Sequence, residues 1–394
     1  MTKEQQYFLH LVKSHLNNTT PEAPNDIDYS ELFKVSEIQD MTAIIAVELK
    51  KLTGENKLTK AQFSPFNQVL GLTVQNYEYK IEGIELLKKV LCKNEIRHLF
   101  LKGVVLRDLY PSPELRTSGD TDVTLNKEDL EKAASLLIDN GFKLQQRSDI
   151  QYVLTYNNEE YQLKTYIDCL NEKHESYFDN IFESNKSTAK NEYTYTLTPI
   201  NHLIYVASHM LKHFKSGGAG IRQLCDIDIL LRKSDIELNE FIRLCCELGI
   251  EKSAKVLLSL CKRYFDTPIA FDYNIDDALN DTLENVLLNG GTFGYGIGDI
   301  GTARLMNTIS ESGSSKSASI KAVFGLFSID KEALYHNYEF ARKHNILLPA
   351  AYLKRIYDGV FKRGKGNIKH IKSMFSDREI ASKMSEMIKE LEIE

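Results

Sequence analysis

The sequence predicts an α+β fold, with a small α/β core flanked by helical regions at both ends. Two observations predict it. Apolar residues recur at helical spacing near both ends of the chain, whereas the middle contains short runs in which apolar and polar side chains alternate. We therefore expect an N-terminal helical region at 1–92, an α/β core at 93–196 and a C-terminal helical domain at 197–394.

The N-terminal region is expected to hold three helices. Tyr7 to Val12 lie in the first helix, and the other two cover 38–52 and 66–92. A polar, proline-containing loop at 17–28 separates the first helix from the second.

The core is expected to alternate strands with short helices. Asn126 is a good N-cap for a helix that Gly141 ends, and Asn157-Asn158 is typical of a hairpin turn. The expected strands are 97–101, 120–125, 142–146, 151–156 and 161–170, and the expected helices are 104–110 and 127–140.

After the core the chain is expected to be helical. Thr198 caps a helix in which Pro199 takes the first position and 200–214 follow. A glycine-rich break at 216–220 leads to a second helix at 221–233.

Composition excludes several classes of protein. With 49 basic and 55 acidic residues the net charge is −6, so a polynucleotide substrate would need a local basic patch. No apolar run approaches the ~18 residues of a membrane span, and the N-terminus does not resemble a signal peptide. The six cysteines form no CxxC pair, so we expect free thiols in a reducing cytoplasm.

Two aspartates carry the strongest chemical signal. Asp120 and Asp122 occupy alternate positions of an expected strand, so their side chains share a face and their Cα atoms lie roughly 6.5 Å apart. Carboxylates at this separation can converge on one or two divalent cations, and Asp168 on a neighbouring strand would add a third oxygen ligand. Asp-x-Asp alone is also common at solvated strand edges. Two metals about 4 Å apart would align a hydroxyl with a nucleotide phosphate.

A lysine and a glycine between a strand and a helix strengthen this interpretation. Gly103 opens the expected helix, where a missing side chain lets backbone N–H groups approach a phosphate. Lys102 adds a cation beside it.

These segments resemble the nucleotidyltransferase superfamily, which is built on a DNA polymerase β-like core with a small mixed β-sheet. They are most similar to an uncharacterised bacterial nucleotidyltransferase family whose members carry Leu-Lys-Gly, Tyr-Pro and Arg-x-x-Gly-Asp-x-Asp. Here these motifs are 101–103, 110–111 and 116–122. Similar stretches at 202–213, 222–227 and 345–349 extend the resemblance to about residues 35–360.

The resemblance implies a metal-dependent transfer of a nucleoside monophosphate from an NTP, such as ATP, to an acceptor hydroxyl or phosphate, with release of pyrophosphate. It implies Mg²⁺ or Mn²⁺ as cofactor, held by Asp120 and Asp122 with Asp168 as third ligand or general base. We expect the acceptor to be a small molecule rather than a polynucleotide. The residues expected to bind the nucleotide are Lys102, Gly103, Arg116, Gly119, Lys212, His213 and Asp226.

Three of these residues come from the C-terminal helices. Without a third ligand motif, His209 and His213 at helical spacing are more typical of packing than of zinc. Arg222 and Asp226 are also four apart and can pair with each other. The resemblance favours Lys212, His213 and Asp226 as lining a cleft opposite the carboxylates.

Two weaker signals favour surface roles. The glycine-rich segment 289–296 follows no strand and lacks the Gly-Lys-Ser/Thr ending of a P-loop, so we expect a connecting loop. The basic run at 351–373 is more typical of a solvated surface than of an anion-binding patch.

Two alternative functions remain open. A glycosyltransferase also uses Asp-x-Asp to bind a metal and a sugar nucleotide, although it places the motif after a longer nucleotide-binding α/β half. A non-catalytic descendant would sense a nucleotide or bind a partner protein. Val104, where the superfamily usually has serine or glycine, and Leu170, where family members often have histidine, leave room for that alternative.

Overall fold

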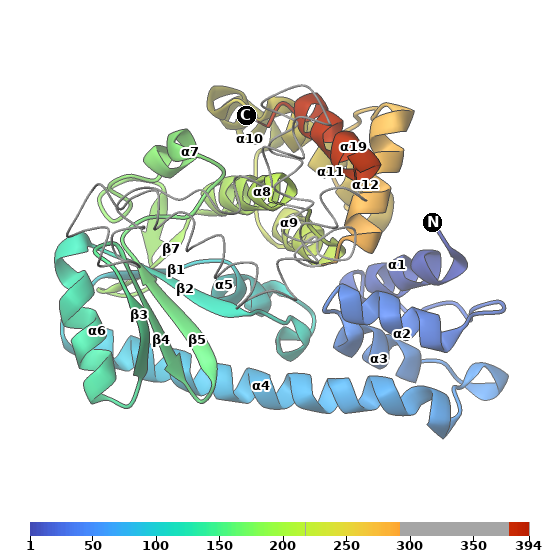
Figure 1. Ribbon diagram of the computed structural model, residues 1–394, viewed down its shortest axis with the longest axis horizontal. Coiled ribbons are helices and arrows are strands. Elements are labelled where there is room, and N and C mark those ends of the chain that lie inside the picture. Colours follow the sequence, from blue (N-terminus) through green and yellow to red (C-terminus); the bar gives the residue numbers. More distant parts are fainter. Residues whose placement is uncertain (217, 292–377, 394) are drawn as a thin grey trace, which may run out of the picture. The chain divides into compact units, whose positions relative to one another are not determined.

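The computed structural model describes residues 1–216, 218–291 and 378–393. The chain divides into two compact units, one formed by Met1–Lys212 with Gly220–Asp276 and the other by His213–Ala219 with Asp277–Glu394. The first unit is α+β, with helices around a seven-stranded mixed sheet (Figure 1). The basic run at 351–373, the motif at 345–349 and the glycine-rich segment from 292 onward lie outside the described residues.

Four helices precede the sheet. They are α1 (Lys3–Leu16), α2 (Tyr29–Ile38), α3 (Thr42–Lys50) and α4 (Lys60–Lys93), with a 3-10 turn at Gly54–Asn56. Capping boxes formed by Thr2 with Gln5 and by Thr59 with Gln62 fix the starts of α1 and α4. The helix expected at 38–52 is present as α3 but begins at Thr42, because Asp40 takes a positive φ of 54° and separates α3 from α2, which was not expected.

The sheet has the order β3-β4-β5-β2-β1-β7-β6. Its strands are β1 (His98–Phe100), β2 (Asp120–Leu125), β3 (Lys143–Arg147), β4 (Gln151–Tyr156), β5 (Glu159–Lys164), β6 (Ser187–Ala189) and β7 (Thr194–Leu197). Parallel pairing joins β2 to β5 and β1 to β7, and the other four pairs are antiparallel. Asn157 and Asn158, with φ of 51° and 64°, make the tight β4–β5 turn that the sequence predicts.

One face of the sheet carries the apolar core. Val123, Leu154, Tyr161 and Leu163 project from it and pack with buried residues of α4 and of α6 (Leu130–Asp139). Figure 1 shows both helices along this face. Since side chains alternate along a strand, the polar residues between these positions face the opposite side.

Several expected elements differ in detail. The helix expected at 104–110 is one α-helical turn, α5 (Gly103–Leu106), continued as a 3-10 turn at Arg107–Leu109. A second 3-10 turn follows at Pro113–Leu115. Asn126 precedes a 3-10 turn (Lys127–Asp129) that leads into α6, and its side chain makes no capping hydrogen bond. The helix α7 (Glu172–Tyr177) and the short strands β6 and β7 were not expected.

Four helices complete the first unit: α8 (Pro199–Lys215), α9 (Ile221–Lys233), α10 (Leu238–Leu248) and α11 (Glu251–Phe265). The part of α8 up to Lys212 belongs to this unit. As predicted, α8 begins at Pro199, where the backbone oxygen of Thr198 accepts from the His202 N–H. Arg232 of α9 donates to Asn17 and to the carbonyl of Phe265, which ties these helices to α1. The second unit contains α12 (Asp277–Asn289) and α19 (Arg378–Glu390), which contact each other.

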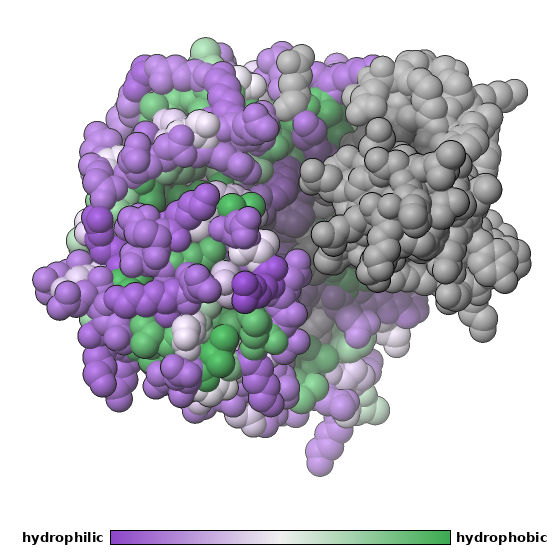
Figure 2. All heavy atoms as spheres, turned by 60° about the vertical axis from the view of Figure 1, so that its left-hand side comes forward, coloured by the Kyte–Doolittle hydropathy of each residue, from purple (hydrophilic) through white to green (hydrophobic). Residues whose placement is uncertain are grey.

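The described surface is mostly hydrophilic, as the face in Figure 2 shows. None of the described helices has the length and hydrophobicity needed to cross a membrane. All six cysteines are free thiols, four buried, Cys92 half-buried and Cys246 exposed.

Candidate active site

The aspartate pair lies on the face of the sheet opposite the apolar core. β2 pairs in register with β5, so Asp120 lies beside Glu160 and Asp122 beside Gln162, all on the same face. Asp122 is 5% exposed, whereas Asp120 is half-buried and its side chain has no hydrogen-bond or ion-pair partner among the described residues. The prediction that both aspartates share one face of one strand is therefore confirmed.

Two lysines neutralise Asp122. Lys164, the last residue of β5, donates to Asp122 Oδ1 at 2.6 Å, and Lys102 donates to Asp122 Oδ2 at 3.1 Å. Burial alone would raise the pKa of Asp122, but the two ammonium groups outweigh burial and lower that pKa to about 2. Each oxygen of this carboxylate thus has its own cation.

Asp168 lies in the loop after β5. The strand expected at 161–170 is wrong in its second half, because β5 ends at Lys164. Lys212 of α8 donates to Asp168 Oδ1, and the His209 ring lies 3.3 Å from the Asp168 backbone oxygen. Lys212, which was expected opposite the carboxylates, therefore contacts one of them directly.

All three carboxylates act electrostatically on the Lys164 ammonium group. Burial lowers the pKa of Lys164, but Asp122 first, and then Asp168 and Asp120, raise it above its ordinary value. Asp122 is the carboxylate that pairs with Lys164 directly. Among the described residues, however, no three His, Cys, Asp or Glu side chains stand close enough together to hold a metal ion without rearrangement.

The expected phosphate turn connects β1 to α5. Lys102 takes φ 43° and ψ −117°, a conformation that non-glycine residues rarely adopt, and its ammonium group lies 5.6 Å from the Tyr205 ring centroid. A Cβ atom on Gly103 would stand 2.5 Å from Arg116 Nη1 and 3.1 Å from Ser118 Cβ. Close packing against these side chains therefore requires glycine at position 103.

Arg116 and Asp226 form a buried ion pair with each other. Arg116 donates from Nε and Nη2 to the two Asp226 oxygens at 3.1 and 2.6 Å, and the Tyr110 hydroxyl donates to Asp226 Oδ1 at 2.7 Å. Burial lowers the pKa of Arg116, but Asp226 more than compensates and raises it. This pair joins the loop before β2 to α9.

Helical spacing indicated that Arg222 and Asp226 pair with each other, but Asp226 pairs with Arg116 instead. Arg222 instead donates to Asp40 Oδ2 at 3.1 Å and to the Thr117 backbone oxygen at 2.7 Å. His213 belongs to the second unit, so the structure does not place it relative to the carboxylates.

Sequence reasoning missed Lys80, Arg107 and Lys164. Lys80 of α4 is 4% exposed and donates to the backbone oxygens of Ser118 and Gly119 at 2.7 and 3.1 Å, which fixes the turn before Asp120. Arg107 is 2% exposed and donates to the Gly103 backbone oxygen at 2.6 Å. The sequence could have indicated Lys80, because a lysine on the apolar face of a helix is expected to be buried and to have a specific partner.

A comparison with known protein families identifies the family of this chain. The model of a family described as an uncharacterised nucleotidyltransferase matches residues 25–266. This chain belongs to that family. The match covers all seven strands of the sheet and both aspartates of β2, whereas the motif at 345–349 lies outside it. Searches of curated proteins and of solved structures give no match.

The chemistry of the donor set fits a divalent cation. Asp120 offers a carboxylate without a partner, and Asp122 and Asp168 offer carboxylates whose charge only lysine ammonium groups now balance. Magnesium prefers carboxylate oxygens among protein ligands. A metal held by Asp122 or Asp168 would have to displace a lysine ammonium group.

Proposed function

We propose that this protein transfers a nucleoside monophosphate from an NTP to an acceptor hydroxyl or phosphate, with release of pyrophosphate. One observation carries the proposal: in a nucleotidyltransferase family member, Asp120 and Asp122 project from one face of β2, Lys102 and Lys164 pair with Asp122, and Lys212 pairs with Asp168. Phosphoryl transfers depend mainly on alignment and charge neutralisation, for which carboxylates and lysines are suited.

The proposed roles follow from position. Asp120 and Asp122 would hold Mg²⁺ or Mn²⁺, with Asp168 as the third ligand or as the base that accepts the proton of an acceptor hydroxyl. The cation, when bound, neutralises charge that develops on the phosphate and on the leaving pyrophosphate. Lys102 and Lys212, half-buried and paired with Asp122 and Asp168, would donate to triphosphate oxygens.

Other expected nucleotide ligands have a supporting role in this proposal. Arg116 and Asp226 bind each other, and they hold the loop that carries Gly119 into β2. α5 is a single turn, so we assign the phosphates to the Lys102 side chain rather than to the helix terminus.

The test separates binding from chemistry. Each NTP is added with Mg²⁺ and thermal stability is measured, where a nucleotide at ~100 times its dissociation constant adds about 2.7 kcal/mol. Mass spectrometry of candidate acceptors then identifies the product. D120N and D122N should each abolish transfer with the fold intact by circular dichroism, whereas D149N, at an exposed turn, should not. Full activity in either active-site variant would refute the mechanism.

The same assays address the two alternatives. Release of a nucleoside diphosphate would indicate the glycosyltransferase, but only one strand, β1, precedes the aspartate pair. The absence of a thermal shift with every nucleotide would favour the non-catalytic descendant.

A further inference from the structure

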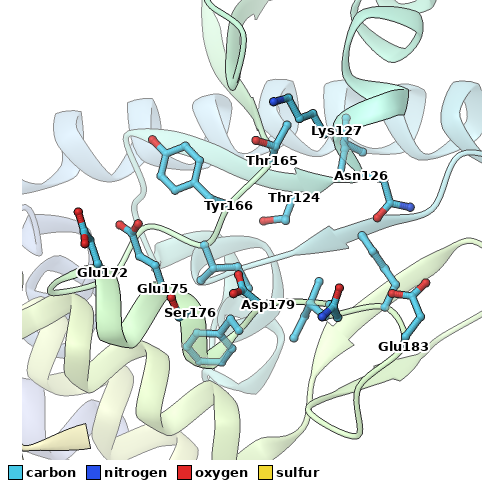
Figure 3. Close-up of a pocket in the computed structure, with 16 residues that line it drawn as sticks. Thr124, Asn126, Lys127, Thr165, Tyr166, Glu172, Glu175, Ser176, Asp179 and Glu183 are labelled. Atoms are coloured by element: carbon cyan, nitrogen blue, oxygen red, sulfur yellow. The ribbon is translucent and has the colours of Figure 1, made fainter.

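A cavity of about 410 Å³ opens beside the carboxylates (Figure 3). It is formed by the end of β2, the loop after β5, α7 and the segment that follows α7. A cavity of this size is typical of a small-molecule site. All of its walls belong to the first unit.

The polar part of the wall is acidic. Glu172, Glu175 and Asp179 line the cavity and have no ion-pair partner among the described residues, whereas Glu183 pairs with Arg97 at 2.7 Å. Lys127 is the one lysine or arginine in the lining. Figure 3 shows Glu175 and Asp179 on one side, with Tyr166 and Thr124 opposite. An anionic ligand would therefore be repelled.

Another part of the wall is apolar. Phe178, Leu125 and Ile167 contribute hydrophobic surface, and Tyr166 adds an aromatic ring. A bare metal ion gains nothing from such surface, whereas a carbon skeleton that carries a cationic group can use both parts of the wall.

A buried hydroxyl lacks a partner in the same cavity. Thr124 is 3% exposed and lines the cavity, and its Oγ1 atom has no hydrogen-bond partner. Buried polar atoms without a partner are rare and call for an explanation. Oγ1 itself is buried, so a ligand hydroxyl or ammonium group would supply the missing hydrogen bond only after the Thr124 side chain rotates toward the cavity.

The cavity adjoins the carboxylates of the proposed reaction. Thr124 shares the strand face with Asp122, two positions away, so their Cα atoms lie about 6.6 Å apart. Burial, and then repulsion by Asp168, raise the pKa of Glu175, so a cation near this carboxylate would be favoured.

We propose that this cavity binds the acceptor and that the acceptor is a small organic cation, a hydroxyl compound with at least one ammonium group. The acidic wall binds the ammonium group, the apolar wall binds the carbon skeleton, and the hydroxyl faces Asp122 and Asp168. The proposal rests on the proposed function for the role of acceptor, but its binding test does not.

The experiment measures binding of matched probes to the full chain without nucleotide. Glucosamine, glucose and glucuronate share a sugar skeleton and differ in charge, and saturation-transfer NMR detects weak binding. We expect glucosamine to bind at least about tenfold more tightly than glucose, and glucuronate not to bind. E175Q/D179N should weaken glucosamine about tenfold, whereas the matched control E128Q/E131Q, exposed and outside the cavity, should not.

Two results would overturn the proposal. The first is equal affinity of the protein for glucosamine and for glucose, or equal affinity of E175Q/D179N and the unchanged protein for glucosamine. The other is tighter binding of glucuronate. Asp179 is exposed, so D179N alone retains the fold and repeats the test if the double variant is unstable. Because no nucleotide is present, a negative binding result would not refute the proposed nucleotidyl transfer. Conversely, full activity of D122N would refute the proposed transfer mechanism but not the binding of an organic cation to this cavity.

Discussion

The buried pair of Arg116 and Asp226 offers the sharpest test of which residues support the site. In D226N the guanidinium group keeps its position but loses its counter-charge in a buried environment. Breaking a buried ion pair by removal of one partner costs roughly 3–5 kcal/mol. R116M leaves a buried carboxylate with one remaining hydrogen bond, from Tyr110, and should cost a similar amount.

The double variant R116M/D226N distinguishes a structural pair from independent roles. It leaves no buried charge uncompensated, so its loss of stability should be smaller than the sum of the two single losses by about 1–3 kcal/mol. The assay is urea unfolding followed by circular dichroism. E240Q breaks an exposed pair with Arg243 and serves as the control, which should change little.

If the losses in unfolding free energy of R116M and D226N add up in the double variant, or if D226N costs less than about 1 kcal/mol, the structural role of the Arg116–Asp226 pair is contradicted. The nucleotide provides a second readout. If the double variant regains stability and still gives a thermal shift with NTP and Mg²⁺, Arg116 supports the site without contact with the nucleotide. Loss of that shift in a folded double variant would instead restore Arg116 as a nucleotide ligand.

Two other predictions concern packing and pH. G103A should destabilise the protein by about 1–3 kcal/mol, because its Cβ would meet Arg116, whereas G119A has nothing within 4 Å and should be neutral in the same unfolding assay. Burial lowers the pKa of His202 from 6.5 to about 4, so between these pH values the unfolded chain binds a proton that the folded chain does not. Stability should fall by up to about 3 kcal/mol as the pH drops through this range, and H202N should flatten that part of the curve. An unchanged pH profile in H202N would contradict the assignment.

The features that sequence predicted well depend on neighbours in the chain. The alternation at 120–125 predicted β2 and the shared face of its aspartates, and the paired asparagines predicted the β4–β5 turn. Proline at position 199 predicted the start of α8. In each case the residues that determine the structure lie within a few positions of one another.

The errors arise where a distant partner overrides a local rule. Helical spacing favoured Arg222 as the partner of Asp226, yet Arg116, 110 residues away, binds it because the fold brings the loop before β2 against α9. Asp168 was expected on a strand, but the loop after β5 turns it toward Lys212 of α8. Periodicity contains no information about either contact.

The lysines show most clearly why the site could be predicted only in part. Lys102, Lys164 and Lys212 come from a turn, a strand end and a helix, and each alone is typical of solvated surface. Together they place three positive charges beside three carboxylates, so the site is close to neutral. On the proposed function, carboxylates that bind a divalent cation release these lysines, which can then donate to the triphosphate. Metal and nucleotide would therefore each increase the affinity of the protein for the other. Thermodynamic linkage requires this reciprocity, because both ligands favour the state in which the lysines have left the carboxylates.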